Sequence, residues 1–290
     1  MTSPVIVERF SSAEEFSRAA EEFLVAREAE NNLLLGIAAD LARGSGYGEI
    51  APYLGVAMRG GRVTAAIVRT PPYGVAVSES DDDEAVDALA QDVLQVYPDL
   101  PGAIGPIRSS GRFVEKWESL TIQRSRIRAN ERIYRCGAVT RARSPRGEMR
   151  AFRGADRQYA LQWWKLFISE SKLPRLGGDA QILDGIDRRV SDPDGGIFFW
   201  EVDGEVVSMA GAGGKTPNGV RIGPVYTPPN ERGKGYGTAL VADLTTAMLE
   251  RGRQFCFLFT DLANPISNSI YSQIGYVPVI DCTMYDLVSP

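Results

Sequence analysis

Residues Val225–Leu240 decide the fold, and they read V-Y-T-P-P-N-E-R-G-K-G-Y-G-T-A-L. A β-rich run ends at Thr227, and the two prolines after it prevent the sheet ladder from continuing. Three glycines then occur within five residues, where a helical pattern begins. Glycine inside a helix costs about 1 kcal/mol relative to alanine, so this placement needs a reason. We interpret the segment as a strand, a loop and a helix, with the loop backbone close to a ligand.

The expected ligand is an anion. The free N–H groups of a first helical turn and the helix dipole attract negative charge, and Arg232 and Lys234 add to this, so a pyrophosphate fits well. A dinucleotide fingerprint would need its third glycine at Thr238. Another phosphate-like run, Gly213–Thr216, is followed by the turn Pro217–Gly219 instead of a helix, which indicates a hairpin tip. A plain basic loop is the remaining alternative.

Two motifs together resemble a known family. Arg232-x-x-Gly235-x-Gly237 is similar to the R/Q-x-x-G-x-G/A motif of the GCN5-related N-acetyltransferase (GNAT) superfamily. The stretch from Asn264 to Tyr276 resembles the family pattern N-x-x-[A/S]-x-x-x-Y-x-x-x-G-[F/Y] at every marked position. The motifs occur in the family's order, separated by an expected helix and a buried strand. The resemblance covers roughly Met149–Leu287 and is to a bacterial branch with an extra N-terminal half.

The resemblance implies an α/β (α+β) fold, with a mixed, mostly antiparallel sheet flanked by helices. It also implies an acetyl-CoA-dependent N-acetyltransferase in which a primary amine attacks the thioester directly. The pantetheine arm would lie along Val225, Tyr226 and Thr227, with an N–H near Tyr226 polarising the thioester oxygen. The pyrophosphate would meet the backbone of Arg232, Gly233, Lys234, Gly235, Tyr236, Gly237 and Thr238. Asn264 and Ser267 would contact the cofactor, and Tyr271 would be the general acid that protonates the CoA thiolate.

The chain contains no histidine, which is the commonest general base and metal ligand. Triads of the Ser-His-Asp and Cys-His types are therefore excluded, and we expect no metal. Deprotonation of the amine needs a carboxylate or a water chain, and Glu201 is the first candidate, with Glu170 and Asp261 as alternatives. The alternative for each of these carboxylates, and the one we favour, is a surface or structural role.

The composition of the chain indicates which partners and which cellular compartment to expect. The net charge is −5, and few aromatic residues accompany the arginine-rich run 124–157, so we interpret this run as an exposed strand and connector and expect no nucleic-acid partner. Only three cysteines occur, and we see neither a secretory leader nor a membrane span. These features favour a cytoplasmic protein, and a homodimer remains open.

We expect two tandem GNAT-like halves: a degenerate domain over 1–140 and a catalytic domain over 141–290. In the N-terminal half, Ser80–Glu84 places acidic residues where the other half has Arg-Gly-Lys-Gly, which predicts a single CoA site per chain. In the second half the expected helices are 155–171, 180–190, 231–251 and 265–274. The expected strands there are 149–153, 197–202, 205–212, 220–227, 255–260 and 276–287. Gly223-Pro224 predicts a bulge or splay in the strand at 220–227.

Three functions compete at this point. An acetyltransferase acting on a small-molecule amine is the first. A protein or peptide N-acetyltransferase is the second, and a CoA-binding sensor or scaffold without turnover is the third. The fold itself does not select the acceptor.

Overall fold

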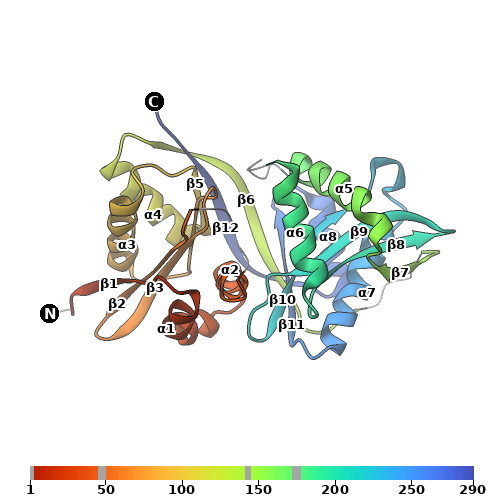
Figure 1. Cartoon of the computed structure of the whole chain (residues 1–290), viewed down its shortest axis with the longest axis horizontal. Coiled ribbons are helices and arrows are strands. Elements are labelled where there is room, and N and C mark those ends of the chain that lie inside the picture. The colour runs from red at the N-terminus through yellow and green to blue at the C-terminus, as the bar shows by residue number, and fades with distance from the viewer. Residues whose placement is uncertain (1–2, 45–49, 141–144, 172–177) are drawn as a thin grey trace. The chain divides into compact units, whose positions relative to one another are not determined.

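The computed structural model describes residues 3–44, 50–140, 145–171 and 178–290 (Figure 1). The chain divides into two compact units. Unit 1 comprises Met1–Arg132 together with Ile280–Pro290, and unit 2 comprises Ile133–Val279. The division therefore falls before the boundary expected at residue 141, and it assigns the C-terminal segment to unit 1. Residues 141–144 of the expected connector lie outside the described residues.

The first half of the chain alternates short strands with helices. Its elements are β1 (Val5–Arg9), α1 (Ala13–Ala26), α2 (Asn32–Ala42), β2 (Tyr53–Arg59), β3 (Arg62–Arg69), β4 (Val75–Val77), α3 (Asp83–Val96), β5 (Gly102–Pro106), α4 (Ile107–Leu120) and β6 (Arg124–Cys136). The helix starts follow local chemistry. Ser12 and Asp82 cap α1 and α3 by accepting a backbone N–H with their side chains, as serine and aspartate do at helix N-termini.

The second half repeats this order. Its elements are β7 (Glu148–Ala151), α5 (Arg157–Glu170), α6 (Asp179–Ser191), β8 (Gly196–Val202), β9 (Glu205–Gly213), β10 (Gly219–Tyr226), α7 (Tyr236–Glu250), β11 (Phe255–Asp261), α8 (Pro265–Ile274) and β12 (Val277–Val288). Each half is thus a strand, two helices, three strands, a helix, a strand, a helix and a strand. This repetition agrees with the expectation of two tandem halves with the same fold.

The last strand of each half contributes residues to the other unit. β12 pairs antiparallel with β5 from Cys282–Pro106 to Asp286–Gly102, inside unit 1. Residues Ile133–Cys136 of β6 belong to unit 2. The strand order is β1-β2-β3-β4-β5-β12-β6 in unit 1 and β6-β11-β10-β9-β8-β7 in unit 2. Each sheet is completed by a strand that is remote in sequence.

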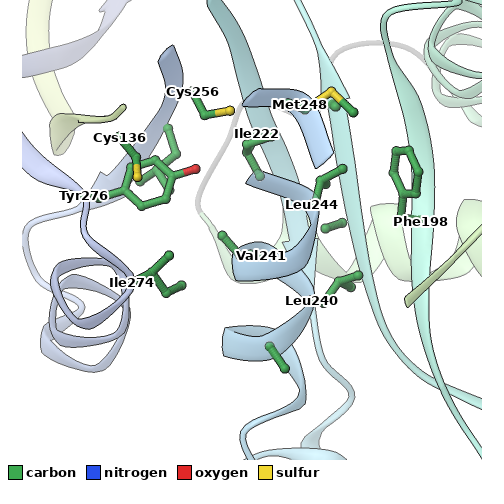
Figure 2. Close-up of a cluster of buried hydrophobic side chains, with 14 of the residues drawn as sticks. Cys136, Phe198, Ile222, Leu240, Val241, Leu244, Met248, Cys256, Ile274 and Tyr276 are labelled. Atoms are coloured by element: carbon green, nitrogen blue, oxygen red, sulfur yellow. The ribbon is translucent and has the colours of Figure 1, made fainter. Parts of the chain in front are cut away.

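Helices cover both faces of each sheet. In unit 2, α5 and α6 pack on one face around Trp163, Phe199 and Tyr226. α7 and α8 pack on the other face, where Leu240 and Leu244 meet the β-strands, as Figure 2 shows. In unit 1, α1 and α2 cover one face, and α3 and α4 the other. Burial of these apolar faces at about 25 cal/mol per Å² provides the main stabilisation of each unit.

Most expected elements of the second half are present, with shifted ends. The helix expected from Glu231 begins at Tyr236, because Gly233 and Gly235 adopt positive φ angles of 77° and 84° that no helix contains. Sequence analysis missed β1, β5 and α4 in the first half. Among the described residues, no helix is both long and apolar enough to span a bilayer.

Candidate active site

The strand β10 separates from its neighbour β11 halfway along its length. Their parallel pairing runs from Gly219–Phe255 to Arg221–Phe257, although both strands continue further. The register between β10 and β9 also shifts between Ile222 and Val225, which confirms the bulge expected at Gly223-Pro224. Val225 and Tyr226 remain paired with β9 on one edge only. The other edge of this segment can therefore accept main-chain hydrogen bonds from an extended ligand.

A glycine loop, residues Pro228–Gly235, connects β10 to α7. It begins with a short 3₁₀ turn at Pro229–Glu231 and ends at Gly235, the N-cap of α7. Because glycine has no side chain, Gly235 makes no side-chain cap. The first N–H groups of an α-helix also lack intrahelical acceptors. The N-terminus of α7 therefore presents uncapped donors next to the open edge of β10.

Both basic side chains of the loop have acidic partners. Arg232 donates from Nε to the Thr227 carbonyl at 2.9 Å and from Nη2 to Glu170 Oε2 at 2.7 Å. Lys234 lies 3.0 Å from a carboxylate oxygen of Glu231. These four charged side chains are all partly exposed, so their ion pairs contribute little to stability and can rearrange.

Tyr226 connects the end of β10 to the end of α5. Its ring is 4% exposed and packs against Trp163, with the ring centroids 6.1 Å apart. Its hydroxyl lies 3.4 Å from Glu170 Oε1. Burial first, and then the Glu170 carboxylate, raises the pKa of Tyr226, which keeps the hydroxyl protonated.

Tyr271 lies on α8, half-buried against the core between the sheet and α7. Its ring meets Tyr276 edge to face, with the centroids 6.0 Å apart. Within the described part of the chain, no hydrogen bond to its hydroxyl is seen. Burial raises the pKa of Tyr271 to about 12, so the phenol carries its proton at neutral pH and can donate it.

Asn264 and Ser267 form the start of α8. The Asn264 side chain accepts from the Ser267 N–H at 3.1 Å, so this asparagine is the N-cap of the helix. The cap gives Asn264 a structural role, worth about 1 kcal/mol. Contact of either residue with a cofactor arm remains a prediction, and the side-chain oxygen of Asn264 would have to serve both the cap and the cofactor.

Glu201, the first candidate for the base, does not lie at the end of β10. It lies on β8, which β9 separates from β10, and it forms ion pairs with Arg150 and, at 3.8 Å, with Arg153. These ion pairs give Glu201 a structural role away from the end of β10, and its role as the base remains a prediction. Asp261 is also occupied, because its side chain accepts from the Ala263 N–H in the turn after β11. Glu170 is the one of the three candidates that contacts the end of β10.

The comparisons with known proteins agree with this geometry. Residues 159–276 match the model of the Acetyltransferase (GNAT) family. These residues form a GNAT domain. The matched span includes β10, the glycine loop, α7 and α8. The match supports acetyl transfer from acetyl-CoA as the general chemistry of the domain, and the acceptor is a separate question.

Solved structures resemble the whole chain, not the GNAT domain alone. A Drosophila protein has a TM-score of 0.71 at 14% identity, covering 98% of this chain and 99% of its own. A GCN5-related N-acetyltransferase from Sphaerobacter thermophilus has a TM-score of 0.64 at 14% identity, covering 100% and 98%. A tandem GNAT protein from the clavulanic acid biosynthesis pathway has a TM-score of 0.58 at 12% identity, covering 98% of each chain. Among curated protein sequences, none is similar enough to count as a match. At these identities the likeness establishes the fold only, namely a GNAT fold in tandem.

The matching place in unit 1 is built differently from that in the GNAT domain. β4 and β5 lie so close that a Cβ at Gly105 would stand 2.6 Å from the Val77 carbonyl oxygen. The N-terminus of α3 is already occupied by the carboxylate of Asp82, which accepts from the Ala85 N–H and from Arg59. Unit 1 therefore has, at this position, closely paired strands and an acidic cap where the GNAT domain has an open strand edge and an uncapped helix N-terminus.

Two contacts of the GNAT domain had no signal in the sequence. One is the approach of Glu170 to Tyr226 and Arg232, over 56 and 62 positions. The other is the contact between the Ser208 and Thr227 hydroxyls at 2.9 Å. Neither follows from a motif, because both depend on how α5 and β9 lie beside β10. In the described residues there is no group of three or more acidic or cysteine side chains suited to a metal ion.

Proposed function

We propose that the protein is an N-acetyltransferase that moves an acetyl group from acetyl-CoA to a primary amine of a small molecule. The observation that carries this proposal is the open edge of β10 directly followed by the uncapped N-terminus of α7. The first suits an extended amide-containing arm, and the second suits a pyrophosphate. The family match of residues 159–276 supports the same donor.

In this proposal the pantetheine arm lies along Val225–Thr227, and the backbone of 232–238 holds the pyrophosphate. Asn264 and Ser267 contact the cofactor from the start of α8. The acceptor must first lose a proton, because alkylammonium groups have pKa values around 10. We expect one such site per chain, since unit 1 has an acidic cap on α3 in place of the glycine loop.

The reaction is a direct acyl transfer. The neutral amine attacks the thioester carbonyl carbon, the C–N bond forms, and an N–H near Tyr226 stabilises the oxyanion. The C–S bond then breaks, Tyr271 gives its proton to the departing thiolate, and the excess proton on the attacking nitrogen returns to the Tyr271 phenolate, which leaves a neutral amide, free CoA thiol and a neutral phenol. Burial raises the pKa of Tyr271 to about 12, so the phenol carries over the working range the proton that this role requires.

A thermal-shift titration with acetyl-CoA tests the donor site. A ligand at about 100 times its dissociation constant should add about 2.7 kcal/mol to the apparent stability of the wild type. The effect should vanish in a loop variant carrying R232Q and G235N. No shift in the wild type would refute the proposal. A shift without thiol release across an amine panel would favour the sensor.

A further inference from the structure

Glu170 and Arg232 form an ion pair at the junction of α5, β10 and the glycine loop. Nη2 of Arg232 lies 2.7 Å from Glu170 Oε2, and its Nε donates to the Thr227 carbonyl at 2.9 Å. The other carboxylate oxygen of Glu170 lies 3.4 Å from the Tyr226 hydroxyl. The carboxylate is therefore beside the residue that ends β10, where the acetyl group would be located.

This pair is neutral as a whole, so it offers no net charge to a cationic acceptor. It is also exposed, with 47% of the Arg232 side chain and 46% of the Glu170 side chain accessible. Ion pairs this exposed hold their partners weakly, and replacing one partner changes an equilibrium by about fivefold at most. A doubly charged pyrophosphate at the N-terminus of α7 is a stronger partner for the same guanidinium.

We propose that Glu170 is the carboxylate that binds the cationic acceptor amine, and that Arg232 covers it until acetyl-CoA draws the guanidinium onto its pyrophosphate. This inference rests on the proposed function of the same site. In the cofactor-free protein the carboxylate is neutralised. In the loaded protein it carries a free negative charge next to Tyr226, where an ammonium group can bind before it is deprotonated and attacks.

A double-mutant cycle on acetyl-CoA binding tests whether the Arg232 guanidinium moves from Glu170 to the pyrophosphate. Isothermal titration gives the dissociation constants of the wild type, E170Q, R232Q and the double variant. E170Q should bind acetyl-CoA two- to fivefold more tightly, since Arg232 no longer has to leave a partner. R232Q should bind about tenfold more weakly, and E170Q should have no effect in the R232Q background. A purely structural Glu170 would not produce this dependence on Arg232.

The matched control is D187N. Asp187 lies on α6 and pairs with Arg157 at the opposite end of α5, at 2.8 Å and with similar exposure, so the substitution likewise removes one carboxylate charge from an exposed ion pair with an arginine. It should leave acetyl-CoA affinity unchanged. If E170Q leaves acetyl-CoA affinity unchanged, or raises it equally in the wild-type and R232Q backgrounds, the proposed movement of Arg232 is overturned. Failure of the wild type to bind acetyl-CoA refutes the proposed function instead.

The acceptor assignment has its own probe, n-butylammonium chloride. In a thermal-shift experiment with CoA present, this ion should raise the melting temperature of the wild type and not that of E170Q. Without CoA it should have no effect on either protein. Equal stabilisation of loaded wild type and loaded E170Q, or none in loaded wild type, overturns the assignment of Glu170 as the amine-binding residue.

Discussion

The hydroxyl of Thr227 lies 2.9 Å from the hydroxyl of Ser208, and this contact joins the end of β10 to β9. Ser208 is fully buried and also donates to the Tyr226 carbonyl at 3.2 Å. Gly237, in the first turn of α7, fits against the same pair, because a Cβ there would stand 3.0 Å from Thr227 Oγ1. The hydroxyl pair and the glycine together fix the distance between the open strand edge and the helix N-terminus.

The substitution G237A should therefore weaken acetyl-CoA binding more than it weakens folding. The new methyl group pushes Thr227 aside, while the better helix propensity of alanine offsets part of the strain, so we expect a stability change within about 1 kcal/mol. Titration calorimetry and thermal unfolding check the two effects. G185A is the control, since Gly185 lies in α6 and the atom nearest to an added Cβ there is 3.6 Å away, which is ordinary contact. It should stabilise the protein and leave affinity intact.

Replacing Gly235 separates conformational strain from ligand binding. Its φ is 84°, and the atom nearest to an added Cβ is 3.9 Å away. A side chain therefore fits sterically, but a residue other than glycine is strained in this left-handed backbone conformation. G235A should cost about 1–2 kcal/mol, and G235N less, because asparagine tolerates this conformation better. Both should bind acetyl-CoA weakly, since a side chain then stands before the first-turn N–H groups. A G235N protein with wild-type affinity would show that the loop is not the cofactor site.

Y271F should lower kcat by 10²–10⁴ and leave the acetyl-CoA dissociation constant within about twofold, as loss of a general acid would. The matched control is Y159F, which removes a hydroxyl from an exposed tyrosine of α5. Equal kcat values for Y271F and the wild type would exclude Tyr271 as the proton donor.

The stability of the protein at high pH provides an independent check on Tyr271. Burial raises its pKa from 10 to about 12, so the folded state holds this proton more firmly than the unfolded state does. The resulting stabilisation is complete below pH 10 and is lost as the pH rises towards 12. Denaturant titrations should show a shallower decline over this window in Y271F. An identical decline would mean that the hydroxyl is not buried.

Acid stability should depend on Asp82 in unit 1. The Arg59 guanidinium, with help from the Ala85 N–H, lowers the pKa of this carboxyl from 3.8 to about 2. Its contribution to stability is therefore present above pH 4 and is lost as the pH falls towards 2. D82N should be less stable at pH 7 and decline less between pH 4 and 2, although asparagine still caps α3. D83N, which changes the same charge at an exposed neighbour, should behave like the wild type.

Local chemistry explains which parts of the molecule were predictable. The glycine loop, the helix at 265–274 and the hairpin from β8 to β9 are each encoded within a few residues, and all are present. β5 was missed because Gly102, Gly105 and Pro106 occupy three of its five positions, which is unusual in a strand. Those glycines permit the close approach of β4 and of β12. The glycine content of β5 is therefore explained by contacts with strands distant in sequence, and no local pattern reveals it.

The site was harder to predict than the loop, for a similar reason. A carboxylate's chemistry depends on its partners, and partners far apart in sequence leave no periodic signal. Glu201 became an ion-pair partner of Arg150, whereas Glu170 came to lie next to Tyr226. The exchange of terminal strands was likewise invisible, since Asp286 finds its partner Arg126 across 160 positions.

That exchange has a consequence for biosynthesis. In the sheet of unit 1, β5 pairs with β4 on one edge, but its other edge has no partner until residues Ile280–Val288 have emerged from the ribosome, although all other strands of the sheet were made more than 140 residues earlier. The domain translated first is thus the last to be completed. Until then its open edge is a surface that chaperones can shield, and a stalled or cleaved nascent chain would leave it exposed to aggregation.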